Sequence, residues 1–142
     1  MLGALLDGTT SPGVFLWRGR PDRDVTAMAA EAGWDVLRLD TREARSREDF
    51  YDAVEKDWAL PAWFGRNLDA LWDVLGDRVT GSTLIIWDGA DAFASVDPDL
   101  ASMVLGVLRD AVSQADRLAV LLRRTPGVSA EPMMLSGLDG LL

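Results

Sequence analysis

The sequence of 142 residues contains no cysteine and no histidine. The absence of cysteine excludes disulfides, thiolate metal sites and cysteine nucleophiles. The absence of histidine removes the most common general acid or base and the usual zinc ligand. An enzyme of this composition could still use carboxylates, alone or with a bound Mg²⁺, but most other catalytic chemistries are excluded.

Positive charge is also scarce. The chain has 14 Lys and Arg residues against 23 Asp and Glu residues, for a net charge of −9. Such a surface repels a phosphate backbone, so we predict no direct contact with nucleic acid. The same charge would steer the chain toward a basic protein partner.

Long apolar runs are absent as well. No segment approaches the roughly 18 consecutive apolar residues of a membrane span. The first ten residues, MLGALLDGTT, carry no basic region, and their apolar stretch is too short for a signal peptide. With 49% hydrophobic and 26% charged residues, the composition is that of a globular domain. We expect a cytoplasmic protein that does not interact with membranes.

Segments typical of strands alternate with segments typical of helices. The apolar runs predict strands at 13–17, 34–40, 82–87 and 117–124. Amphipathic spacing and capping signals predict helices from near residue 22 to 32, at 46–58, after Asn67, and at 97–115. This alternation predicts an α/β fold with a small, mainly parallel sheet. The uninterrupted apolar runs at 84–87 and 118–122 predict central or near-central strands.

The predicted helices have recognisable starts. Ser46 and Asp49 form an S-x-x-D arrangement typical of a capping box, and Asp97 with Pro98 is a common start of a helix. We expect residues 1–33 to be a flexible start followed by a strand and helix that extend the same domain, with the strand added at an edge. Residues 125–142 have no clear period and are expected to form a tail.

The stretch LPAWFGRNLDALWDVL, residues 60–75, combines apolar and acidic residues. With Asn67 as the N-cap, the residues Leu68, Leu71, Trp72 and Leu75 form one apolar helix face. Asp69 and Asp73 then lie one turn apart, where like charges repel by a few tenths of a kcal/mol. The helix dipole favours Asp69 in the first turn, but Asp73 has no local reason to be acidic. A solvated helix face is one interpretation, and a binding function is the other.

The aromatic residues of this stretch also permit two interpretations. Trp72 occupies a position that faces the core, so we expect it to be structural. Trp63 and Phe64 lie in a loop between Pro61 and Gly65, where no helical stripe continues their apolar character. They either pack against the preceding helix or form an exposed binding hot spot beside the two acids.

The same residues resemble the signature segment of the barstar family, the intracellular inhibitors of small secreted ribonucleases of the barnase type. The family pattern is Leu-Pro, any residue, two aromatics, Gly, any residue, then Asn-Leu-Asp-Ala-Leu-Trp-Asp. It is met here by Leu60, Pro61, Trp63, Phe64, Gly65, Asn67, Leu68, Asp69, Ala70, Leu71, Trp72 and Asp73. The order of the predicted elements in residues 34–124 also follows the family. The resemblance therefore implies a barstar-like domain over 34–124.

The resemblance also implies a role for each matched residue. Asp73 would enter the active site of the ribonuclease in place of an RNA phosphate, and Asp69 would pair with a basic residue of the nuclease. Other partner-binding residues implied by the match are Trp63, Phe64 and Gly65, which would cover the active site; Asn67 and Trp72, which would complete or support the surface; and Asp110. Arginine binds a carboxylate bidentately, as it binds phosphate, which fits this mimicry.

Some positions depart from the family pattern. Trp63 and Phe64 stand where Tyr is common, so hydrogen bonds from phenolic hydroxyls are lost. Arg66 occupies a position that is often acidic in the family, which could weaken binding to a basic nuclease or adapt it to a different one.

Three functions are therefore compared. The leading prediction is a stoichiometric, non-catalytic inhibitor of a basic ribonuclease or related toxin domain, without metal or cofactor. The second is a Mg²⁺-dependent phosphoesterase that uses Asp69, Asp73, Asp88 and Asp91. The sequence has neither a phosphate-binding G-x-x-x-x-G-K-[ST] loop nor histidine to support that chemistry. The third keeps the barstar-like fold but binds a partner that is not a nuclease.

Overall fold

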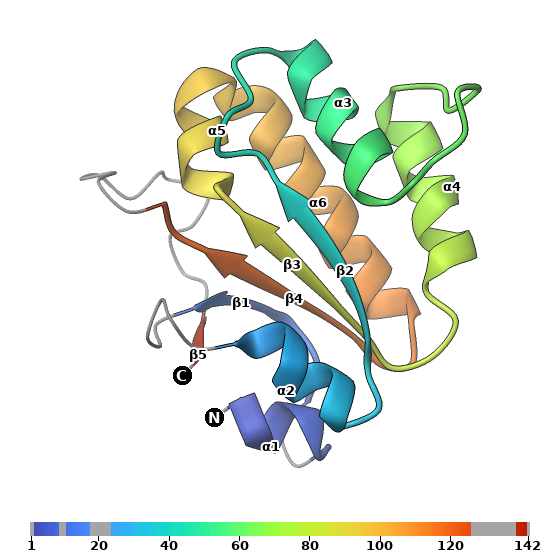
Figure 1. Cartoon of the computed structure of the whole chain (residues 1–142), viewed down its shortest axis with the longest axis vertical. Helices are drawn as coiled ribbons and strands as arrows, with labels where there is room; N and C mark the ends of the chain where they lie inside the picture. Colours follow the sequence, from blue (N-terminus) through green and yellow to red (C-terminus); the bar gives the residue numbers. More distant parts are fainter. Residues whose placement is uncertain (1, 9–10, 18–23, 126–138, 142) are drawn as a thin grey trace.

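The computed structural model describes residues 2–8, 11–17, 24–125 and 139–141, and one or two helices separate consecutive strands among the first four (Figure 1). The strands are β1 (Val14–Trp17), β2 (Asp35–Asp40), β3 (Thr83–Asp88), β4 (Leu118–Arg123) and β5 (Asp139–Leu141). The helices are α1 (Leu2–Leu6), α2 (Val25–Glu31), α3 (Arg47–Asp57), α4 (Leu68–Arg78), α5 (Ala90–Val96) and α6 (Pro98–Gln114). None of these described helices has the length and apolar character needed to span a bilayer.

The strands form one sheet in the order β2-β3-β4-β1-β5, and all neighbouring pairs are parallel. The central register places Ile85 of β3 between Leu37 of β2 and Val120 of β4. The predicted α/β class with a mainly parallel sheet is therefore confirmed. The two uninterrupted apolar runs form β3 and β4, which both lie inside the sheet as predicted.

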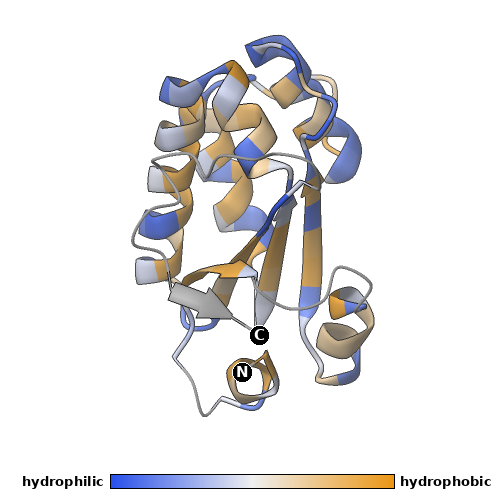
Figure 2. Cartoon of the chain, turned by 90° about the vertical axis from the view of Figure 1, so that its left-hand side faces the viewer, coloured by the Kyte–Doolittle hydropathy of each residue, from blue (hydrophilic) through white to orange (hydrophobic). Residues whose placement is uncertain are grey.

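Helices cover both faces of this sheet. Ile85 and Trp87 of β3 point into a core formed with α3, α4, α5 and α6. Leu84 and Ile86 point into a second core formed with α1 and α2. Figure 2 shows the hydrophobic sides of the helices turned toward largely hydrophobic strands. Because side chains alternate between the faces of a strand, burial on both sides favours consecutive apolar residues, as at positions 84–87.

The starts of three helices are capped as the sequence predicts. The side chains of Ser46, Asn67 and Asp97 each accept a hydrogen bond from the backbone N–H three residues later. The arrangement at Ser46 departs from a standard capping box, because the Asp49 carboxylate accepts from the N–H of Arg45 rather than from that of Ser46. Each cap satisfies an N–H group that the helix itself leaves unpaired.

The N-terminal segment differs from the prediction. The expected flexible start contains α1, whose residues Leu2, Leu5 and Leu6 are buried in the second core. Three leucines at this spacing form one apolar face, and the strands beneath offer an apolar surface that a single sequence does not reveal. The strand β1 was expected at an edge of the sheet, but it pairs with β4 on one side and β5 on the other.

Two further elements were not predicted. The end of the expected tail contributes β5, while residues 126–138 and 142 lie outside the described residues. Helix α5 begins after Gly89, which has φ +80° and no capping side chain. A Cβ atom at Gly89 would lie 2.7 Å from the backbone nitrogen of Arg42, so a side chain there would clash with the neighbouring backbone. A seven-residue helix without a polar cap leaves little signal in the sequence.

Candidate functional site

Helix α4 presents two carboxylates to solvent. Its start is fixed by Asn67, whose Oδ1 accepts a 2.8 Å hydrogen bond from the Ala70 N–H. Leu71 and Leu75 are buried in the core, which turns Asp69 and Asp73 outward, where both are exposed. Neither carboxylate forms a hydrogen bond or ion pair with any residue that the structure describes. Two unpaired like charges one turn apart repel each other, so binding of a cationic partner would stabilise them.

The structure separates the two aromatic residues of the α3–α4 loop, which we define as residues 59–67. The side chain of Phe64 is 5% exposed and packs against Tyr51 of α3, with ring centroids 6.1 Å apart. Its N–H donates a 3.0 Å hydrogen bond to the carbonyl of Pro61. Trp63, by contrast, is 84% exposed. Phe64 therefore anchors the loop, and Trp63 is the aromatic side chain that the loop presents to solvent.

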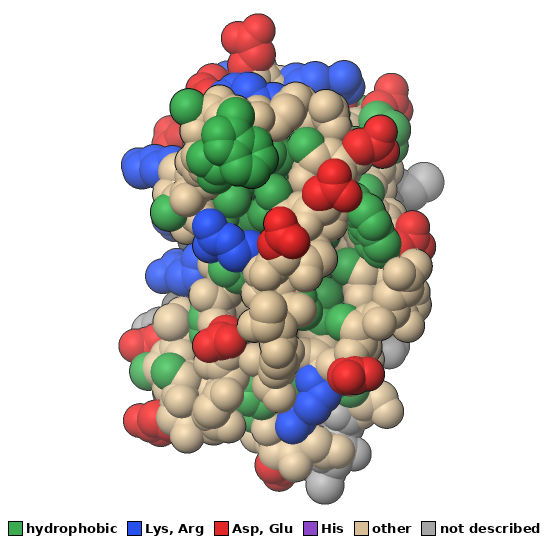
Figure 3. All heavy atoms as spheres, turned by 90° about the vertical axis from the view of Figure 1, so that its right-hand side faces the viewer, with side chains coloured by type: hydrophobic (Ala, Val, Ile, Leu, Met, Phe, Trp, Pro, Cys, Tyr) green, Lys and Arg blue, Asp and Glu red, His purple; other side chains and the backbone are tan. Residues whose placement is uncertain are grey.

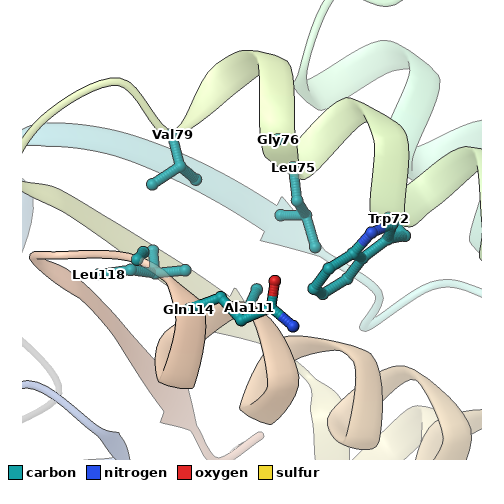
Figure 4. Close-up of a pocket in the computed structure, with 8 residues that line it drawn as sticks. Trp72, Leu75, Gly76, Val79, Ala111, Gln114 and Leu118 are labelled. Carbon is teal, nitrogen blue, oxygen red and sulfur yellow. The ribbon is translucent and has the colours of Figure 1, made fainter.

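Trp72 was expected to face the core, but it lies at the margin and is 36% exposed. Its ring forms one end of a groove of about 260 Å³ between α4 and α6 (Figure 4). The groove exists because Gly76 on α4 and Ala111 on α6 are too small to fill the space between the helices. The remaining lining residues are Leu75, Val79, Gln114, Ala115 and Leu118.

The other predicted partner-binding residues surround this surface. Gly65 is exposed in the loop, and its carbonyl accepts a 3.1 Å hydrogen bond from Nδ2 of Asn67. Asp110 is exposed on α6, next to Ala111 of the groove. Figure 3 views the side of the molecule on which α4 lies and shows several acidic side chains between hydrophobic patches. The α3–α4 loop with Trp63 and helix α4 with Trp72, Asp69 and Asp73 lie on this side of the molecule (Figure 1), and Asp110 lies on α6, the helix that forms the other wall of the groove.

Arg66 has a structural role that the sequence analysis did not identify. It lies in the α3–α4 loop, and its guanidinium donates hydrogen bonds to the carboxylates of Asp52 and Glu55 on α3. The hydrogen bond with Asp52 is the main reason why the pKa of Arg66 is raised. The signal available in the sequence was the pair of acids three residues apart on the exposed face of α3.

Two of the four carboxylates proposed for a phosphoesterase, Asp88 and Asp91, have other partners. Asp88 at the end of β3 accepts hydrogen bonds from Arg123 at 2.8 Å and from Arg38 at 3.1 Å. Burial raises the pKa of Asp88, but the bonds with Arg123 and then Arg38 outweigh it and hold the pKa below its ordinary value. Buried Asp91 accepts from the backbone N–H and the hydroxyl of Thr125. Within the described part of the chain, no three acidic side chains are grouped so that they could hold a metal ion.

Comparison with solved structures supports the fold. The crystal structure of Cdc6p from Pyrobaculum aerophilum is similar over 98% of this chain and 43% of that chain, with a TM-score of 0.58 and 13% sequence identity. The chain therefore spans less than half of that structure. At this identity the similarity concerns the arrangement of strands and helices and carries no argument about function.

A family model described as "Barstar (barnase inhibitor)" matches residues 34–124, which is more than half of the chain. The matched residues run from the start of β2 to the end of β4. They include the α3–α4 loop, α4, and the α6 wall of the groove. The chain belongs to the barstar family.

Proposed function

We propose that this protein inhibits a basic ribonuclease of the barnase type by covering its active site with α4 and the α3–α4 loop. The observation that carries the proposal is the exposed, unpaired carboxylate pair of Asp69 and Asp73 on α4. Membership of a family named for a barnase inhibitor supports the same function.

Asp73 is proposed to take the position of an RNA phosphate. A carboxylate presents two oxygens that an arginine can bind bidentately, and such charge-assisted hydrogen bonds are short and strong. Asp69, one turn earlier, would pair with a second cation at the rim of the same site. Both side chains reach a partner without first breaking an ion pair with any described residue.

The aromatic side chains are proposed to exclude water from these contacts. Trp63 offers an apolar surface that is already exposed, and Trp72 offers part of its ring beside the groove. Large aromatic residues around a charge pair are typical of binding hot spots, because a charge pair is worth more when water is removed. Phe64 would contribute indirectly, through the position that it gives to the loop.

The proposed function requires occlusion rather than turnover. An inhibitor of this kind forms a complex of one molecule with one nuclease and needs neither metal nor cofactor. The net charge of −9 would accelerate its encounter with a basic enzyme, and added salt would slow that encounter.

The test is a titration of barnase with the purified protein, with cleavage of a fluorogenic RNA substrate as the readout. We expect activity to fall linearly to a sharp end point at equimolar protein, with no change when EDTA is present. Undiminished cleavage at a large excess of the protein would contradict inhibition of this nuclease. If a pull-down then captured a partner without ribonuclease activity, the surface would serve the alternative function, as an interaction module for a protein that is not a nuclease.

A further inference from the structure

We propose that Arg66 is the positioning residue that holds the α3–α4 loop in the conformation in which Trp63 is presented to the partner. The inference deepens the proposed function and rests on it for the identity of the partner. It assigns to Arg66 a role in ordering the binding surface rather than a direct contact with the nuclease.

The side chain of Arg66 joins the loop to α3 at three acceptors. Its Nη2 lies 2.7 Å from Oδ1 of Asp52 and 3.0 Å from the carbonyl oxygen of Glu48, and its Nη1 lies 3.0 Å from Oε1 of Glu55. The three acceptors belong to residues four and three positions apart, so they lie along one side of α3. One planar guanidinium can satisfy all three acceptors because its donors point in fixed, different directions.

The backbone of the loop needs such a support. Arg66 has φ +53° and Ala59 has φ +51°, so both residues adopt the left-handed conformation that disfavours side chains with a Cβ. A residue in this region persists only where surrounding contacts determine its conformation. At Arg66 those contacts come from its own side chain, which bonds to α3 while its backbone turns the chain toward Asn67 and α4.

Arg66 also changes how the charge of the surface is distributed. Its guanidinium lies against Asp52 and Glu55, so these two acids are paired, whereas Asp69 and Asp73 are not. A cation in the loop would repel a basic nuclease if it were free to turn outward. In this structure it is bound to α3, and the unpaired negative charge is concentrated on α4.

Loss of Arg66 is therefore expected to raise both the association and the dissociation rate, which have opposite effects on affinity. Removing one positive charge makes the surface more acidic, which accelerates association with a basic partner. Releasing the loop removes the preorganised contact of Trp63, which accelerates dissociation. A substitution that only disturbed the fold would not produce this pair of effects.

The first measurement uses the free protein. Amide hydrogen exchange followed by NMR would compare Arg66→Gln with Lys56→Gln, which removes an exposed positive charge of α3 whose ammonium group has no partner in the described structure. The reporters are the N–H groups of Leu60, which donates to the carbonyl of Glu55 on α3, and of Phe64, which donates to the carbonyl of Pro61 in the loop. In Arg66→Gln we expect both to exchange about tenfold faster or more, since bonds to charged groups are the strong kind, with no change in Lys56→Gln. Unchanged exchange in Arg66→Gln would overturn the proposal.

The second measurement is stopped-flow binding to barnase. Both variants should associate at least as fast as the unmodified protein, but only Arg66→Gln should dissociate faster, by about tenfold. Arg66→Lys keeps the charge but reaches fewer acceptors, so its dissociation rate should lie between those of Arg66→Gln and Lys56→Gln. Faster exchange with unchanged dissociation would show that the loop is held for structure alone and would overturn the positioning role. If the unmodified protein does not bind barnase, the proposed function fails for this nuclease, while the exchange measurement still decides whether Arg66 orders the loop.

Discussion

The indole Nε1 of Trp34 donates a 3.0 Å hydrogen bond to the carbonyl oxygen of Leu6. The guanidinium of Arg117 lies 4.9 Å above the ring of Trp34 and contacts the same carbonyl. A tryptophan immediately before β2 thus attaches the N-terminal helix α1 to the matched family region. The second core of the protein is closed by residues that lie far apart in the sequence.

Trp34→Phe should lower the free energy of unfolding by about 1 kcal/mol or somewhat more, because the carbonyl of Leu6 loses its buried hydrogen bond and keeps only the longer contact with Arg117. Urea denaturation of the variant measures this loss. The free energy of binding to a ribonuclease should not change, because α1 and α4 cover opposite faces of the sheet. A variant of unchanged stability would show that the hydrogen bond does not hold α1.

Asp73→Ala should weaken inhibition more than any other single change on the surface, by about 2–5 kcal/mol, since the partner's buried cation is left unpaired. The dissociation constant for barnase measures this effect. The free energy of unfolding should stay within about 0.5 kcal/mol and could rise, because repulsion from Asp69 is removed.

Asp77→Ala is the matched control for this prediction. Asp77 is exposed on the same helix, one turn beyond Asp73 and further from the α3–α4 loop. It should affect affinity only through net charge. If Asp73→Ala kept its affinity but unfolded, or if the two variants lost the same affinity, the phosphate mimicry would be wrong.

The two exposed tryptophans should respond differently to truncation. Trp63→Ala should leave stability within about 0.5 kcal/mol but weaken ribonuclease binding by about 2 kcal/mol, as expected for an exposed hot-spot residue. Trp72→Ala should lower stability by about 2 kcal/mol, less than the 3–5 kcal/mol typical of a fully buried tryptophan, because part of its ring is exposed. Thermal unfolding and calorimetric titration distinguish the two. Equal losses of stability would contradict the separation of roles.

Acid should destabilise the protein through Asp88. Its pKa is lower in the folded protein than in the unfolded chain, so the ionised group stabilises the fold above the ordinary pKa of about 3.9. That contribution is lost as the pH falls from there through the lower folded pKa. Asp40, whose pKa is lowered mainly by its hydrogen bond with Arg42, acts in the same pH range.

The variant Asp88→Asn tests this assignment. At neutral pH it should be less stable by about 2 kcal/mol, because Arg123 and Arg38 lose a partly buried counter-charge. Its melting temperature should also fall less steeply than that of the unmodified protein below about pH 4. If the melting temperatures of the two proteins fell equally steeply with pH below about pH 4, other carboxylates would control the acid transition.

Much of the fold could be predicted because local chemistry determines it. The caps at Asn67 and Asp97 act on N–H groups three residues away, and the apolar run of β3 reflects burial on both faces of its own strand. The placement of Asp69 beside Asp73 follows from helix geometry alone. These features require no information about distant parts of the chain.

The errors concern contacts between segments distant in sequence. The two interpretations of Trp63 and Phe64 could not be separated locally, because Phe64 is buried against Tyr51 of α3 while Trp63 is exposed. Trp72 is partly exposed beside a groove that Gly76 of α4 and Ala111 of α6 leave between the two helices. Similarly, α1 and β5 each require a surface that other elements provide, which no local pattern reveals.

The alternation along β3 has a consequence for cooperativity. Ile85 and Ile86 are identical residues, adjacent in the chain and both fully buried, yet one packs with α3–α6 and the other with α1 and α2. The two cores share the same strand backbones, so neither layer can melt without removing a wall from the other. We therefore expect the family region and the N-terminal extension to unfold in one transition. In Ile85→Val, which weakens one core, and in Ile86→Val, which weakens the other, probes of both layers should report the same midpoint.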